Sequence, residues 1–316
     1  MKLDRVVIAI DFSERSIAAA RWAAKSFAPS AELVLVHVLT VPRVPRFLSG
    51  RYPMPGEADA WRARAQLQLR QLGRQLRSGI VWDEVRVGKP DDQVLAVARD
   101  YDADLIVVGS HRDRLALWNR LGSTAERVLR GADVPVLVVH GAPQVPPRRL
   151  LAAVDDSRAA AAVIVHAHAL AARFGASGKL AHVLPEQMIQ RLTATGEVRA
   201  HHLRSIEAEQ RLVVDTYDWL VRQVEGSNGA VAAAVMLGDA AEAILKEAMH
   251  AGVELVVLGR ERGTAGPRHP LGSVSSAVLR GAKCPVLVIP RGDAHGDAAA
   301  HRSEEWGAPE QPALTG

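Results

Sequence analysis

Two stretches of the chain, Val128-Leu-Arg-Gly-Ala-Asp-Val-Pro-Val-Leu-Val-Val139 and Val278-Leu-Arg-Gly-Ala-Lys-Cys-Pro-Val-Leu-Val-Ile289, are copies of one pattern. Each ends in a run of aliphatic residues after a proline, which is typical of a parallel strand buried on both faces. Three more pairs of segments recur upstream, in the same order: Asp104–Gly109 with Glu254–Gly259, Leu35–Val38 with Leu180–Val183, and Val6–Asp11 with Leu150–Asp155. Repetition at this long spacing indicates a duplicated domain and not a short-period solenoid.

The repeat divides the chain into two domains, which its 316 residues are enough to build. We expect the first domain to cover residues 1–142 and the second to cover residues 150–291. Residues 143–149, Pro-Gln-Val-Pro-Pro-Arg-Arg, are rich in proline and predict a short, stiff linker. Residues 292–316 have no hydrophobic periodicity and predict a disordered tail.

Strands and helices are expected to alternate through both halves. The aliphatic runs that predict strands are 5–10, 32–38, 84–87, one that ends at Gly109, and 135–139, then 150–154, 178–183, 231–236, one that ends at Gly259, and 285–289. This alternation predicts the α/β class, with two tandem Rossmann-like, doubly wound parallel sheets covered by helices on both faces. Such sheets bind ligands beyond the carboxyl ends of their strands, so those positions are the ones to inspect.

Composition and charge exclude several classes of protein. Apolar residues make up 48% of the chain, so a largely disordered protein is excluded. The formal net charge is +4 and no basic run is interleaved with aromatic residues, so we expect no nucleic-acid partner. The single cysteine, Cys284, can form neither a disulfide within the chain nor a cysteine-based zinc site, which favours a reducing compartment. Without a signal-peptide pattern or a membrane-length apolar stretch, the sequence predicts a cytoplasmic protein with no membrane partner.

Sequence motifs of catalysis and metal binding are absent. The chain has no Walker A loop, no HExxH, no CxxC and no GxSxG. No nucleophile is paired with a base, and the histidines lack the spacing of a helical metal pair. We therefore expect a protein that is not an enzyme and holds no metal through its own residues. The recurring His37 and His182 are interpreted as packed or hydrogen-bonded histidines.

The candidate site lies in the residues that follow the first and fourth strands. Asp11 follows the first strand and could accept hydrogen bonds from a base or a ribose. After the fourth strand and a loop, Gly122-Ser123 begins the next helix. The amides at a helix N-terminus attract a phosphate, and the hydroxyls of Ser123 and Thr124 add donors. A nucleotide laid across the sheet edge and a simple set of helix caps are equally good interpretations of these residues.

The spacing of these residues resembles that of the universal stress protein family, in its tandem two-domain form, and the resemblance covers residues 4–291. Nucleotide-binding members of that family carry G-x2-G-x9-G-[S/T] after the fourth strand, where the first glycine permits a tight turn and a close approach of the backbone. Both halves keep the outer glycines at that spacing: Gly109 with Gly122, and Gly259 with Gly272. The middle glycine is replaced by Arg112 in the first half and by Arg262 in the second.

The resemblance implies a strand order of 3-2-1-4-5 in each domain and pairing of domains through the last strand, so that the fused halves form a pseudo-dimer within one chain. A further pairing of two chains, as a homodimer through last-strand edges, is the partner expectation. It implies that an adenine nucleotide binds in the first domain at Ala9, Ile10, Asp11 and Val38 on the adenine side, and at Val108, Gly109, His111, Arg112, Gly122, Ser123 and Thr124 on the ribose and phosphate side. The matching residues of the second domain are Asp155, Val183, Leu258, Gly259, Arg262, Gly272, Ser273 and Val274. There Glu261 replaces the histidine of the turn and repels phosphate, so the first domain is the better candidate.

The functional hypothesis is therefore a stress-response regulator that binds ATP or another adenine nucleotide, with or without Mg²⁺, and acts on an unknown protein partner. One alternative is a nucleotide-free protein-interaction module, in which Arg112 and Arg262 close the two pockets. A second alternative is a slow ATPase, for which the sequence supplies no base.

Overall fold

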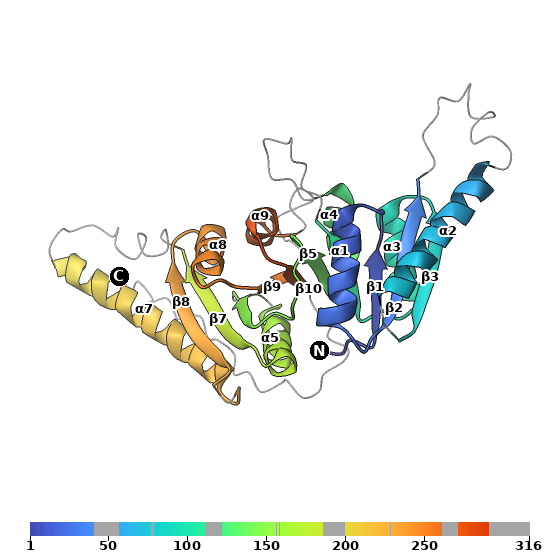
Figure 1. Cartoon of the computed structure of the whole chain (residues 1–316). Coiled ribbons are helices and arrows are strands. Elements are labelled where there is room, and N and C mark those ends of the chain that lie inside the picture. Colours follow the sequence, from blue (N-terminus) through green and yellow to red (C-terminus); the bar gives the residue numbers. More distant parts are fainter. Residues whose placement is uncertain are drawn as a thin grey trace, which may run out of the picture.

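The computed structural model shows ten strands with helices between them (Figure 1). The first half contains β1 (Arg5–Ala9), α1 (Glu14–Trp22), the π-helix η1 (Ala23–Phe27), β2 (Glu32–Leu39), α2 (Glu57–Gln75), β3 (Val81–Val87), α3 (Pro90–Asp100), β4 (Leu105–Gly109), α4 (Ser123–Gly131) and β5 (Val136–Val139). The second half contains β6 (Arg149–Ala153), α5 (Ala160–Phe174), β7 (Ser177–Leu184), α7 (Ala200–Val224), β8 (Val231–Leu237), α8 (Ala240–His250), β9 (Leu255–Arg260), α9 (Ser273–Gly281) and β10 (Val286–Pro290). The structure describes residues 1–40, 57–76, 79–110, 122–155, 157, 159–185, 200–227, 229–260 and 271–290, with the backbone alone at 200–209. The segment expected to form a tail, 292–316, lies outside them.

All ten strands belong to one continuous sheet, in the order β3-β2-β1-β4-β5-β10-β9-β6-β7-β8. Each half has the predicted order 3-2-1-4-5, and its own strands are parallel. The two halves join through their last strands, as the family resemblance implies, because β5 and β10 pair antiparallel, with Leu137 opposite Leu287. Both strands are fully buried runs of aliphatic residues, apart from the terminal proline of β10, and pairing satisfies the backbone groups that each would expose as an edge.

This pairing also corrects the expected homodimer through last-strand edges. The two sides of β5 are occupied by β4 and β10, and those of β10 by β5 and β9. A second chain therefore cannot add a strand at either one. The edges of the sheet are instead β3 and β8.

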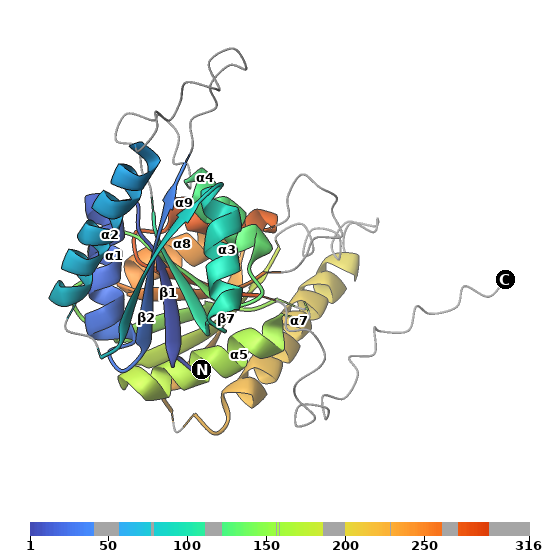
Figure 2. The ribbon, with the colours of Figure 1, turned by 90° about the vertical axis from the view of Figure 1, so that its right-hand side faces the viewer.

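Helices cover both faces of the sheet, and each face has a core shared by the two halves. Helices α1, α2, α5 and α7 bury their apolar residues in one cluster, while α3, α4, α8 and α9 contribute to the other. Figure 2 shows α1 and α2 on one side of strands β1 and β2, with α3 on the other. Because each cluster contains strand and helix residues from both halves, the two domains pack as a single body.

The connector between the halves lies against the first domain. The indole Nε1–H of Trp22 donates to the carbonyl oxygen of Val145 at 2.8 Å, and the Ser26 hydroxyl donates to that of Gln144 at 3.3 Å. Beside these contacts, Phe27 of the first half packs against Phe174 of the second, with ring centroids 5.3 Å apart. The last residue of the predicted linker, Arg149, already belongs to β6.

A buried arginine joins the halves on the opposite face of the sheet. Arg260 ends β9 and is 3% exposed, and its guanidinium donates to the carbonyl oxygens of Leu129, Arg130 and Ala132. These carbonyls belong to the C-terminal end of α4, where backbone acceptors lack helical partners and the helix dipole is negative. An arginine of the second domain thus caps a helix of the first. Backbone carbonyl oxygens, and not a carboxylate of α4, accept these hydrogen bonds.

Replacing Arg260 with methionine should destabilise the whole chain. The variant leaves buried carbonyls without a donor, so we expect the free energy of unfolding to fall by at least about 2 kcal/mol. Denaturant unfolding followed by circular dichroism measures this change. The matched control is Arg173→Met, which removes an exposed arginine from the last turn of α5 and should change stability by less than about 0.5 kcal/mol. Equal effects of the two substitutions would show that the cap on α4 contributes nothing.

Candidate functional site

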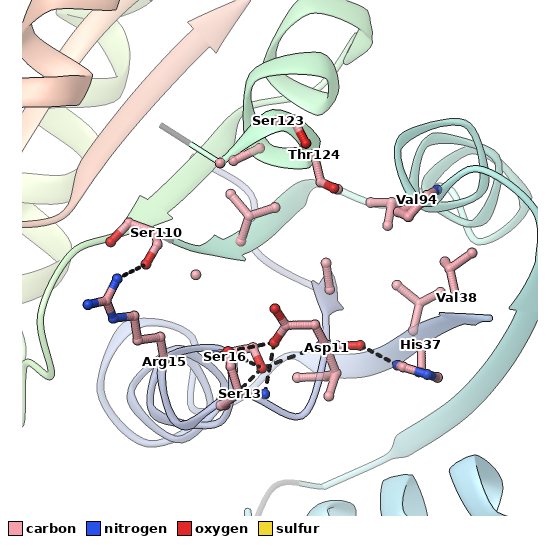
Figure 3. Close-up of a pocket in the computed structure, with 18 residues that line it drawn as sticks. Asp11, Ser13, Arg15, Ser16, His37, Val38, Val94, Ser110, Ser123 and Thr124 are labelled. Atoms are coloured by element: carbon pink, nitrogen blue, oxygen red, sulfur yellow. Dashed lines mark hydrogen bonds between the residues drawn. The ribbon is translucent and has the colours of Figure 1, made fainter. Parts of the chain in front are cut away.

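A cavity of about 300 Å³ opens at the carboxyl ends of β1, β2 and β4, between α1, α3 and α4 (Figure 3). All the predicted first-domain residues that the structure describes line it: Ala9, Ile10, Asp11, Val38, Val108, Gly109, Gly122, Ser123 and Thr124. His111 and Arg112 lie outside the described residues, so the effect of the arginine at the middle motif position stays a prediction. The strand ends that carry these residues therefore meet at one cavity.

The turn after β1 is fixed by side-chain hydrogen bonds. Oδ1 of Asp11 accepts from the backbone N–H of Ser13 at 2.9 Å and from its hydroxyl at 2.6 Å. Ser13 is the N-cap of α1, and its Oγ accepts from the N–H of Ser16 at 3.2 Å. The cap interpretation of Asp11 is therefore correct in the structure. Figure 3 shows the same carboxylate facing the cavity, so capping the turn and lining the site are compatible.

Phe12, which lies between Asp11 and Ser13 in the turn, has an unusual backbone conformation. Its φ is 60°, a left-handed value that a bulky side chain adopts rarely and at a cost in energy. Its ring lies against the imidazole of His37, with centroids 4.5 Å apart. This contact beside the cavity helps to hold the strained turn in place.

The recurring histidines join the ends of neighbouring strands in both halves. Nδ1 of His37 lies 2.7 Å from the carbonyl oxygen of Ile10, and Nδ1 of His182 lies 2.8 Å from that of Val154. A carbonyl oxygen only accepts, so Nδ1 carries the proton and donates in each case. The interpretation of these residues as hydrogen-bonded histidines is confirmed.

The lack of a side chain at Gly109, which ends β4, is explained by a different contact from the one expected. A Cβ on Gly109 would lie 3.1 Å from Cα and N of Ser16, so the missing side chain lets the start of α1 cross the strand. In the second half, a Cβ on Gly259 would lie 2.9 Å from Cβ of Ala159. Close packing of helix on strand therefore requires both glycines, and close approach to a ligand is not needed to explain them.

The wall opposite this turn is the N-terminus of α4. The N-cap residue Gly122 has no side chain to bond the first amides of the helix. Ser123 and Thr124 occupy the first turn and line the cavity with it. Helix α4 is also fixed from the side, because Nε of Arg127 lies 2.9 Å from Oδ1 of the nearly buried Asp91 at the start of α3.

The cavity is apolar at one end and charged at the other. In Figure 3, Val38, Val94 and His37 lie at one end, while Arg15 and Ser110 lie at the other. Arg15 was missed in the sequence analysis, which named only Asp11 after the first strand. Its position four residues after Asp11 was the available signal, since the turn brings that helix start back to the strand end.

The corresponding hollow of the second half is smaller, about 100 Å³. Of the residues predicted there, Asp155, Val183, Leu258, Gly259 and Val274 line it. Gly272 and Ser273 were also predicted but are not among its lining residues, and Arg262 lies outside the described part of the chain. Larger side chains reduce the space, because Ile244 stands where the first half has Val94, and Val163 where it has Ala19.

Other chemistry in the described part of the chain is sparse. No group of three or more His, Cys, Asp or Glu side chains there could hold a metal ion. Burial raises the pKa of the Cys284 thiol to about 11, so this side chain stays protonated at neutral pH. None of the described helices combines the length and the apolar character needed to cross a membrane.

Comparisons with known proteins match both halves of the chain. The universal stress protein family model matches residues 2–140 and 147–290. A universal stress protein of Mycolicibacterium smegmatis is 30% identical over 297 residues, which cover 90% of this chain and 96% of that protein. The crystal structure of a universal stress protein from Archaeoglobus fulgidus covers 92% of this chain and 97% of its own, with 20% identity and a TM-score of 0.65, which shows the shared fold. A universal stress protein solved in complex with cAMP covers 44% of this chain and 98% of its own, with 23% identity and a TM-score of 0.34. From these matches, the chain belongs to the universal stress protein family and carries two tandem copies of its domain.

Proposed function

We propose that the first domain binds an adenine nucleotide such as ATP, and that binding regulates the contact of this protein with a protein partner. The observation that carries this proposal is the cavity, which joins an apolar end to a helix N-terminus without a side-chain cap. Its volume of about 300 Å³ lies at the lower end of the range for small-molecule sites. The flat, uncharged base and the anionic phosphates of a nucleotide would therefore meet different surroundings within this one cavity.

The two ends of the cavity suggest how the nucleotide lies. The base fits the apolar end formed by Ile10, Val38 and Val94. The phosphates fit the start of α4, where backbone amides and the hydroxyls of Ser123 and Thr124 supply donors. Asp11, in the turn after β1, lies between Arg15 and Val38 in Figure 3, where a carboxylate can accept from the base or the ribose.

Mg²⁺ would come to this site with the nucleotide. The described residues offer no cluster that could hold the ion alone. Mg²⁺ commonly binds through substrate phosphates, water and one or two carboxylates, so ATP itself supplies most of the ligands. We propose regulation by binding and not by turnover, because Asp11 and His37, the acid and the imidazole of the cavity, are engaged in fixing its turn and strand ends.

The second domain favours the nucleotide-free alternative. Its hollow is about 100 Å³, and Val274 stands in place of the hydroxyl-bearing Thr124. We therefore propose a single binding site in each chain. The second half then acts as support and as a surface for the partner.

Calorimetric titration of the nucleotide-stripped full chain with ATP and Mg²⁺ tests the proposal. We expect saturable binding at a single site, which Val38→Trp should abolish by filling the apolar end of the cavity. The matched control is Val183→Trp, the same substitution at the equivalent position of the second half, which should leave the affinity unchanged. Melting curves establish that both variants are folded.

The outcomes separate the candidate functions. No binding by the folded, stripped wild-type chain would overturn nucleotide binding and favour the interaction module. Binding that survives Val38→Trp but not Val183→Trp would place the site in the second domain. Phosphate release that depends on Asp11 would revive the slow ATPase.

Replacing Thr124 with valine should weaken ATP binding without changing the shape of the helix start. Valine already occupies this position in the second half, as Val274. Loss of one hydroxyl donor to phosphate corresponds to about 0.5–1.5 kcal/mol, so the dissociation constant should rise about threefold to tenfold. Adenosine, which has no phosphate, should bind the variant as it binds the wild type. An equal loss for both ligands would show that the substitution acts on the fold of the site.

A further inference from the structure

Arg15 is a cation at the edge of the cavity. It lies in the first turn of α1, is half-buried and lines the cavity. Its Nη1 donates to the carbonyl oxygen of Ser110 at 3.3 Å. Among the residues that the structure describes, no carboxylate lies within ion-pair distance of its guanidinium. Within the described residues, the planar guanidinium of Arg15 with its several N–H donors therefore makes one long hydrogen bond, to a neutral acceptor.

Other partly buried arginines of the described chain have stronger partners. Arg5 pairs with Glu32, and Arg86 pairs with Glu84 and Asp100. The guanidinium of the buried Arg260 donates to backbone carbonyl oxygens at the C-terminal end of α4. Burying a charge without a partner is costly, and among the described residues Arg15 has neither the carboxylate partners of Arg5 and Arg86 nor the several carbonyl acceptors of Arg260.

The position of Arg15 points to a ligand anion. In Figure 3, it lies at the end of the cavity away from Val38, with the N-terminus of α4 along the wall between them. A nucleotide with its base at Val38 and its first phosphate at Ser123 would extend its further phosphates toward this end. Guanidinium pairs well with phosphate oxygens because its donors match their geometry.

The matching position of the second half carries no cation. There Asp155 accepts from the N–H of Ser157, as Asp11 accepts from Ser13, so the two turns are in register. The same register places Ala159 at the position of Arg15, and Ala159 is 1% exposed. The charge is thus a feature of the larger cavity and is not a requirement of the fold.

We propose that Arg15 binds the terminal phosphates of the ligand, so that the first domain selects nucleoside di- and triphosphates over monophosphates and nucleosides. This inference rests on the proposed function, because it assumes that a nucleotide occupies the cavity with its base at the apolar end. On binding, the guanidinium exchanges its bond to Ser110 for charge-assisted bonds to phosphate.

The test compares adenosine, AMP and ATP as ligands of four full-length proteins by calorimetry. In Arg15→Gln, we expect ATP affinity to fall about tenfold to a hundredfold, as for a lost charge-assisted hydrogen bond, while adenosine affinity stays within about twofold. Arg15→Lys keeps the charge but loses the planar pair of N–H donors of the guanidinium, and should give an intermediate ATP affinity. The matched control is Arg21→Gln, which removes an exposed cation from the same helix and should change neither ligand.

Each result decides the inference. ATP binding by Arg15→Gln at wild-type affinity would overturn it. An equal loss of ATP and adenosine would also overturn it, because Arg15 would then act only by holding Ser110. If the wild-type chain binds adenosine and ATP equally, the proposed function stands and the role of Arg15 fails. If it binds neither, the proposed function fails first and this inference fails with it.

Discussion

The antiparallel pairing of β5 with β10 is the constraint on which the rest of the structure depends. Each domain ends in a short strand whose residues are aliphatic on both faces, and such a strand is unstable as an exposed edge. Joining the two edges removes this liability and makes one sheet of ten strands. The helices on either face then share their cores across the junction, so neither domain has a complete apolar interior without the other.

Within this frame, the two halves use equivalent positions for different purposes. The second half has Ile244, Val163 and Val274 where the first has Val94, Ala19 and Thr124, and its hollow is about a third as large. Directly after the recurring glycine of the fourth strand, the first half has Ser110 and the second has Arg260. This position therefore lines a cavity in one half, while in the other it holds the end of a helix of the neighbouring domain.

Much of the fold and of the candidate site could be predicted from the sequence, because both follow from local patterns. Aliphatic runs and the repeat predicted the strands, and the family resemblance implied their order in the sheet. The strand ends and the same resemblance named residues that line one cavity. The reasons for particular residues could not be predicted where they depend on contacts distant in sequence. Gly109 is explained by the approach of α1, and Arg260 by the C-terminal carbonyls of α4. The pairing of β5 with β10 was expected from the family resemblance and not from any local pattern in the chain.

Helix α4 is the element in which these constraints meet. Its N-terminal residues form a wall of the first-domain cavity, and its C-terminal carbonyls hold the guanidinium of Arg260 from the second domain. Between these ends, the ion pair of Arg127 with Asp91 ties the helix to α3, which lines the same cavity. An anion at the N-terminus and a cation at the C-terminus both interact favourably with a helix dipole, so the two ends do not compete. The geometry of the cavity wall is therefore maintained by contacts from both copies of the duplicated domain, although the cavity itself belongs to one.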